Sequence, residues 1–231
     1  MRALLSSKSL SDGDIILDFF AGSCSTAHAV MQLNAEDNIG RRFIMVQLPE
    51  DVAPNTEAAK AGFKTIADIG KERIRRSATK IKEEAGDVEG LDLGFRVLKI
   101  DTSNMQDVYY RPDQVEQKGL LDAVDNIKPD RTPEDLLFQV MVDWGTDLAA
   151  PISRETVQGK TIFFVNKSEY AGPDLIACFD TGVTEALVKE LAKHEPVKAV
   201  FRDNGFVSDA VKINVEQIFR QLSPTTDVKS I

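Results

Sequence analysis

Hydrophobic and polar positions follow two different periods along the first third of the chain. Residues 15–20 and 43–48 are short apolar runs of the kind that form buried strands, and Pro49 ends the second run. Residues 26–33 and 65–84 instead repeat apolar side chains at the three- to four-residue spacing of an amphipathic helix. The pattern therefore predicts strands that alternate with helices.

The pattern continues with a third apolar run and then a polar, turn-rich stretch. Residues 94–101 predict a strand. Farther on, Thr132 and Asp135 form a capping box with Pro133 at the first helical position, and Gly145 closes that helix. The later elements expected are a helix at 132–144, a hairpin at 152–166 turning at Gln158-Gly159, strands at 175–180, 197–203 and 228–231, and helices at 184–194 and 213–222.

This alternation predicts an α/β protein with a parallel or mixed sheet. The polar stretch after residue 101 places the boundary between two domains, residues 1–104 and residues 105–231. Hydrophobic residues make up 42% and charged residues 28% of the 231 positions, as in an ordinary globular protein. No apolar run approaches the roughly 20 residues that a membrane span needs.

Charge and cysteine content narrow the function classes further. The net charge of −9 argues against a strong nucleic-acid clamp, because phosphate contacts need clustered Lys and Arg. Cys24 and Cys178 lie far apart and have no neighbours spaced like metal ligands. With no targeting segment apparent, we expect free thiols, no metal site and a cytoplasmic location.

The first candidate site is the stretch DIILDFFAGSCST, residues 14–26. A strand that ends at Asp18 and a turn of small residues would place backbone N–H groups and a helix N-terminus around one point. Gly22 would let the backbone approach a ligand, and Ser25 or Thr26 could cap the helix. The turn lacks the Gly-Lys-Ser/Thr ending of a phosphate loop. The pattern alone fits either a ligand site or an ordinary tight turn.

A second candidate lies at the end of the next predicted strand. In Rossmann-type halves, this position offers a carboxylate to the ribose hydroxyls of a nucleotide. Here Gln47 occupies that position, and Glu50 follows three residues later. On the pattern alone, a solvated strand end is the simpler explanation of the same residues.

At this point several stretches together resemble a known family. ILDFFAGSCSTAHAVM followed by RRFIMVQLPE resembles motifs I and II of amino-methylating DNA methyltransferases with a permuted motif order. More narrowly, it resembles the modification (Mod) subunit of type III restriction–modification systems. The resemblance extends over nearly the whole chain, through IADIGKERIRRSATKIKEE with LDLGFRVLKIDTSN, EDLLFQVMVDWGTDLAAPI, and VFRDNGFVSDAVKINVEQIFRQLSP.

The resemblance implies a partial Rossmann-like, S-adenosylmethionine-dependent methyltransferase fold, followed by a small α/β C-terminal domain. It also implies that the first loop binds S-adenosylmethionine. Cys24 stands where the family loop usually has a second glycine, and Gln47 stands at the usual motif II acid. Asp101 matches the motif III position near the adenine of the cofactor. The cofactor-binding residues implied are Asp18, Phe20, Ala21, Gly22, Ser23, Thr26 and Gln47.

The catalytic motif of the family is not found in this sequence. Amino methylation in the family uses an Asp-Pro-Pro-Tyr-like motif that holds a flipped base, and the chain contains no Pro-Pro pair. In the permuted order, that motif and the target-recognition region precede motif I. We therefore expect the C-terminal part of a DNA adenine-N6 methyltransferase, with no catalytic residue of its own and no activity alone. DNA would be a partner through the intact enzyme, and the restriction subunit would be another.

Two other interpretations remain open. The chain could be a non-catalytic interaction module that docks the restriction subunit or another copy, which the missing motif and the acidic balance favour. An exposed sheet edge would promote a homodimer. A dinucleotide-binding oxidoreductase domain is the third interpretation, although residues 20–26 lack the G-x-G-x-x-G spacing.

Overall fold

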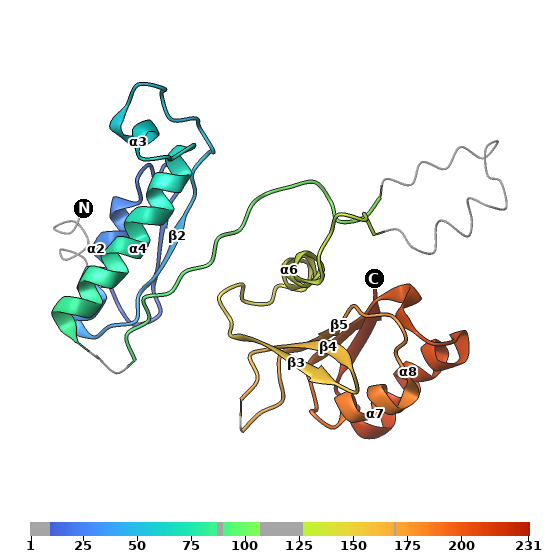
Figure 1. Cartoon of the computed structure of the whole chain (residues 1–231). Helices are drawn as coiled ribbons and strands as arrows, with labels where there is room; N and C mark the ends of the chain where they lie inside the picture. The colour runs from blue at the N-terminus through green and yellow to red at the C-terminus, as the bar shows by residue number, and fades with distance from the viewer. Residues whose placement is uncertain (1–9, 87–89, 107–126, 169) are drawn as a thin grey trace. The chain divides into compact units, whose positions relative to one another are not determined.

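The computed structural model describes residues 10–86, 90–106, 127–168 and 170–231. The chain divides into two compact units (Figure 1). The boundary lies between residues 97 and 98, whereas the sequence predicted it between residues 104 and 105. Both units combine helices with strands, which confirms the predicted α/β class. Among the helices of these described ranges, none is both long and apolar enough to cross a membrane.

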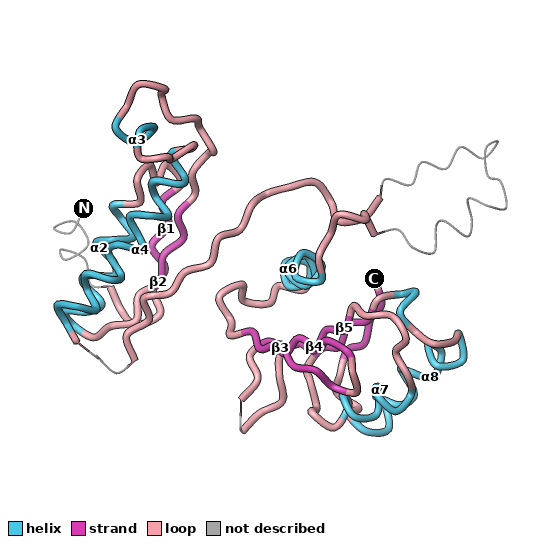
Figure 2. The backbone as a smooth tube through the Cα atoms, in the orientation of Figure 1, coloured by secondary structure: helices cyan, strands magenta, loops and turns pink. Residues whose placement is uncertain are grey.

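The first unit is built around a strand–helix–strand crossover. Its two strands pair in parallel, with Leu17 opposite Ile44. The helix between them connects the end of one strand to the start of the next, as parallel pairing requires (Figure 2). The elements in chain order are β1 (Ile15–Asp18), α2 (Ser25–Asp37), β2 (Arg42–Met45), α3 (Glu57–Lys60) and α4 (Ile66–Ala85).

Among the described residues, helices cover one face of this two-stranded sheet. Phe43 and Met45 pack beneath α2 and α4, against a core that includes Met31 and Ile74. On the opposite face, Ile15, Leu17 and Ile44 are 51%, 52% and 49% exposed. Parallel sheets normally have both faces buried, and their strands are accordingly apolar throughout. The described part of the first unit therefore leaves an apolar sheet face open.

The strand predicted for residues 94–101 is wrong. Residues 91–100 have no regular secondary structure, and Val97, Leu98 and Ile100 are exposed. Phe95 does pack at the edge of the core, where the Arg75 guanidinium lies 5.6 Å from its ring centre. An apolar run forms a strand only where a neighbouring strand satisfies its backbone N–H and C=O groups. No described strand of this unit pairs with the segment.

The second unit contains a five-stranded mixed sheet in the order β3-β4-β5-β6-β7. The first three strands are antiparallel and the last three are parallel, which confirms the predicted mixed sheet. The elements in chain order are α6 (Pro133–Asp143), β3 (Ile152–Val157), β4 (Lys160–Val165), β5 (Leu175–Cys178), α7 (Glu185–Ala192), β6 (Lys198–Phe201), the 3₁₀ turn η1 (Asp203–Gly205), α8 (Asp209–Leu222) and β7 (Asp227–Ser230).

Helices cover both faces of this second sheet. Consecutive residues of β4 point to opposite faces, so that Phe163 packs beneath α6 while Phe164 packs beneath α7 and α8. Phe201 and Phe219 complete the core on the α7–α8 side. The central strands are therefore buried on both sides, which explains their continuous apolar sequences.

Local signals in the sequence place several ends of these elements. The capping box of Thr132 and Asp135 starts α6, and Gly145 follows its end with a φ of 64°. Gln158 and Gly159 both adopt positive φ in the hairpin turn, as a two-residue type I′ turn requires. Helix α8 begins at residue 209 rather than at the predicted 213, because the Ser208 hydroxyl caps it by accepting a hydrogen bond from the N–H of Val211.

Candidate functional site

The loop between β1 and α2 is held by the carboxylate at the end of β1. One oxygen of Asp18 accepts a hydrogen bond from the backbone N–H of Phe20 at 3.2 Å. The other oxygen accepts from the hydroxyl of Thr26, in the first turn of α2, at 2.6 Å. Asp18 therefore joins the strand end, the start of the loop and the helix in one contact network.

The end of β2 holds the same loop from a second direction. Gln47 accepts a hydrogen bond at its Oε1 from the backbone N–H of Gly22, at 2.7 Å. Its Nε2 donates to the carbonyl of Leu48 at 3.2 Å. The N–H of Ala21 also donates to the carbonyl of Val46. Gln47 is therefore engaged with the loop itself, a contact that the sequence pattern did not indicate.

Helix α2 starts without a side-chain cap, so the predicted capping by Ser25 or Thr26 is wrong. The Thr26 hydroxyl is directed to Asp18, and Ser25 is the first helical residue. Cys24 occupies the N-cap position in the left-handed region, with φ 57° and ψ 39°. Its N–H donates to the carbonyl of Ala21 at 2.7 Å, which closes the turn. Such a backbone is uncommon for a residue that carries a Cβ.

The side chain of Cys24 is buried against Gly70 of α4. A Cβ added to Gly70 would lie 2.6 Å from the Cys24 Sγ and 3.3 Å from the carbonyl oxygen of Gly22. Gly70 was not among the site residues predicted from the sequence. The signal was present, however, because a glycine inside an amphipathic helix costs about 1 kcal/mol relative to alanine and often marks a close approach.

Burial shifts the pKa values of two titratable groups beside the loop, Cys24 and His28. Burial, together with the nearby Asp18 carboxylate, raises the pKa of the Cys24 thiol above its ordinary value. Burial lowers the pKa of His28, and the positive charges of Arg73 and Lys80 lower it further. A thiol with a raised pKa is a poor nucleophile. The described residues also contain no group of three or more His, Cys, Asp or Glu suited to a metal ion.

The structure brings the predicted site residues together at this loop. Hydrogen bonds join two pairs of these residues, Asp18 with Thr26 and Gln47 with Gly22. Phe20 differs from them, because its ring is 88% exposed and meets the ring of Phe19 edge to face. The loop therefore offers a shaped backbone, a helix N-terminus and two exposed aromatic residues, Phe19 and Phe20. Ala21 is buried and Ser23 is half-buried within the same turn.

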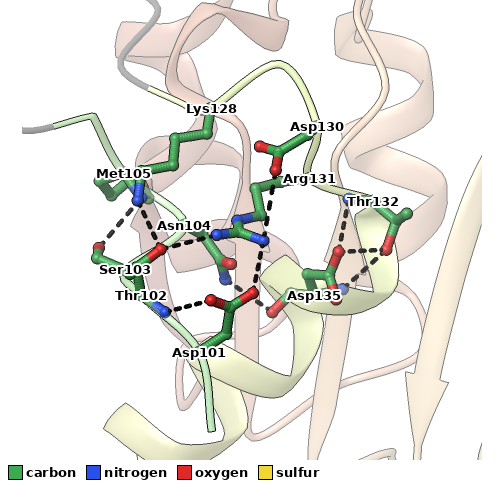
Figure 3. Close-up of polar contacts among 10 residues, drawn as sticks. All are labelled: Asp101, Thr102, Ser103, Asn104, Met105, Lys128, Asp130, Arg131, Thr132 and Asp135. Carbon is green, nitrogen blue, oxygen red and sulfur yellow. Dashed lines mark hydrogen bonds and ion pairs between the residues drawn. The ribbon is translucent and has the colours of Figure 1, made fainter. Parts of the chain in front are cut away.

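Asp101 lies in the second unit and has its own partners there (Figure 3). Its carboxylate accepts from the N–H of Thr102 at 2.7 Å and from Arg131 at 3.1 Å. These two contacts, the first more than the second, lower the pKa of Asp101. Asn104 also donates to the carbonyl of Asp135. This segment is therefore anchored at the start of α6.

Comparisons with known proteins give several relatives, although no family model matches the chain. The Mod subunit of the type III restriction-modification enzyme EcoPI, from Escherichia phage P1, is 31% identical over 84% of this chain and 29% of its own length. The StyLTI Mod subunit from Salmonella typhimurium is 46% identical over 40% of the chain and 14% of its own length. The type II methyltransferase M.KpnI from Klebsiella pneumoniae is 42% identical over 26% of the chain. The chain thus spans less than a third of the length of these Mod subunits.

Proposed function

From the premise that this chain is a homologue of type III restriction–modification Mod subunits, we propose that it carries the cofactor-binding part of a DNA adenine-N6 methyltransferase. The observation that carries the proposal is the loop between β1 and α2. Asp18 and Gln47 hold this loop from two sides, at the ends of two parallel strands. Ligands of open α/β sheets bind beyond such carboxyl ends of strands.

The proposed ligand is S-adenosylmethionine. Its carboxylate suits the positive end of α2. The exposed ring of Phe20 can attract the sulfonium through its π face. An amide nitrogen has two hydrogens, so Gln47 can serve both the Leu48 carbonyl and a ribose hydroxyl. In this proposal the β1–α2–β2 crossover is part of a Rossmann-like sheet.

The methyl-transfer step needs groups that this sequence does not carry. When bound at the loop between β1 and α2, S-adenosylmethionine would supply, through its methyl–sulfur bond, the methyl group that the N6 nitrogen of a flipped adenine accepts. The adenine must be held in line with that bond, and its amino nitrogen must lose a proton. The Asp-Pro-Pro-Tyr-like motif would hold the base. We therefore propose that the chain binds the cofactor and methylates DNA only together with a polypeptide that supplies this motif.

Calorimetric titration of S-adenosylmethionine into the full chain tests this proposal, with NAD as the control ligand. We expect selective binding of S-adenosylmethionine. Phe20→Ala should weaken it about fivefold, as the loss of roughly 1 kcal/mol of cation–π attraction predicts. Tyr170→Ala, which removes an equally exposed ring of the second unit, should leave it unchanged. Equal binding of NAD, or no binding of either ligand, would contradict the proposal.

A second candidate function is docking of another protein, and the open face of the β1–β2 sheet favours it. Ile15, Leu17 and Ile44 form an apolar surface of the kind that proteins seldom leave in water. On this interpretation the surface binds a second copy of the chain or the restriction subunit. Sedimentation equilibrium tests self-association directly. A pure monomer at the highest attainable concentration would exclude the homodimer.

A further inference from the structure

Besides its contacts with Asp18, the loop between β1 and α2 contacts the end of β2 and helix α4. On the side of β2, Gln47 accepts the N–H of Gly22. On the side of α4, the Cys24 sulfur and the Gly22 carbonyl oxygen lie close to the position that a Cβ at Gly70 would occupy. The helix approaches so closely that even a methyl group at Gly70 would overlap the Cys24 sulfur. The loop is therefore enclosed between a strand end and a helix.

The Cys24 side chain lies against Gly70, within the core of the first unit. Cys24 adopts a left-handed backbone, and its thiol is buried in the core that also contains Ala27 and Ile74. Because the Cys24 side chain packs against α4, it does not extend over the opposite, outer face of the loop. The space left by the missing side chain of Gly70 thus accommodates the Cβ and sulfur that Cys24 adds to the turn.

We propose that Gly70 is a positioning residue for the cofactor loop, acting through Cys24 and Gly22 rather than by touching the ligand. Its lack of a side chain lets the loop take the shape in which Gly22 reaches Gln47 and the outer face stays open. Cys24 and Gly70 are consequently a size-matched pair, in which a larger residue at one position demands a smaller residue at the other. This inference rests on the proposed S-adenosylmethionine site.

Gly70→Ala in the full chain separates this inference from ordinary helix propensity, because the two predict opposite signs. Alanine is the better helix former, so propensity alone predicts a more stable α4. The steric contact instead predicts a displaced loop, with amide exchange in residues 10–37 about tenfold faster and S-adenosylmethionine bound about tenfold more weakly. Adding Cys24→Gly should bring both quantities back to within about threefold of the wild type, because glycine tolerates the same φ and removes the sulfur.

Thr79→Ala, on the exposed part of α4, is the matched control that raises helix propensity without touching the loop. It should change neither quantity by more than about twofold. If amide exchange in residues 10–37 of the Gly70→Ala variant is unchanged or slower, Cys24 and Gly70 are not a size-matched pair. Faster exchange without weaker cofactor binding would overturn the positioning role. If the wild-type chain binds no S-adenosylmethionine, the proposed function and the cofactor role of Gly70 both fall, while rescue of the exchange rates by Cys24→Gly still decides whether the pair exists.

Discussion

The two sheets of this protein use similar apolar strands in different surroundings. Strand β5 (LIAC) is buried at every position, between α6 on one face and α7 and α8 on the other. Strand β1 (IILD) has alternate side chains exposed, because the described helices cover one face of its sheet only. An apolar run therefore shows that a strand can be buried, while the neighbouring elements decide whether it is.

This difference bears on the candidate site. The loop lies at the end of the half-covered sheet, so its supporting structure depends on specific hydrogen bonds and on the contact with α4. The second unit contains a core on each face of its sheet. Perturbations should consequently affect the two units to different extents.

Amide hydrogen exchange of the full chain should show the largest contrast. Amides of β5 and β6 should exchange on the order of 100-fold more slowly than those of β1 and β2, because opening a two-sided core exposes more apolar surface. Mass spectrometry of peptides that cover each strand measures this ratio. Equal protection of β1 and β5 would show that something further covers the first sheet.

A matched pair of leucine substitutions should show the next largest effect. Leu187→Ala in α7 removes a side chain that is 1% exposed, and we expect it to lower the free energy of unfolding by about 2–5 kcal/mol. Leu17→Ala in β1 makes the same chemical change at a position that is 52% exposed, and we expect less than about 1 kcal/mol. Urea unfolding followed by circular dichroism measures both values. Similar losses would contradict the contrast in burial.

Charged substitutions test whether the open sheet face associates. Ile44→Lys should reduce self-association by about fivefold or more, because it places a charge within the apolar surface. Ile213→Lys, at an exposed position on α8, is the matched control in the second unit and should have little effect. Sedimentation velocity over a concentration series provides the measurement. If the control suppresses association and Ile44→Lys does not, then the interface lies in the second unit.

The smallest difference between the two units is expected in the response of their helix starts to acid, because each unit has a helix that begins with a capping box. Hydrogen bonds from Lys71 and Thr65 lower the pKa of Asp68, and bonds from Thr132 lower the pKa of Asp135. A carboxylate with a lowered pKa stabilises the fold above its unfolded value of about 4 and loses this effect as the pH falls further. We therefore expect both helix starts to loosen in acid below about pH 4. Carboxyl carbon shifts across a pH titration measure each value, and a midpoint at or above 3.8 for either residue would contradict this expectation.

Short-range sequence signals were sufficient to predict the capping box and the hairpin turn, because neighbouring residues alone determine these features. The capping box of Thr132 and Asp135 depends on residues three apart, and the hairpin turn depends on the left-handed tolerance of Gln158 and Gly159. The strand–loop–helix at residues 15–37 was likewise predicted, because an apolar run, small residues and a helical period follow one another directly. Even here, the capping of α2 was mispredicted, since Asp18 draws the Thr26 hydroxyl away from the helix end.

Sequence by itself thus determined the α/β class, the helices with their local caps, the hairpin and the position of the candidate loop. Tertiary structure alone decided that residues 94–101 form no strand, that the described helices leave one face of the first sheet exposed, and that Gly70 makes room for Cys24. These outcomes depend on contacts between residues distant along the chain. Gly70 and Cys24 are distant in sequence and touch only once α2 and α4 have packed, so no local pattern contains their contact.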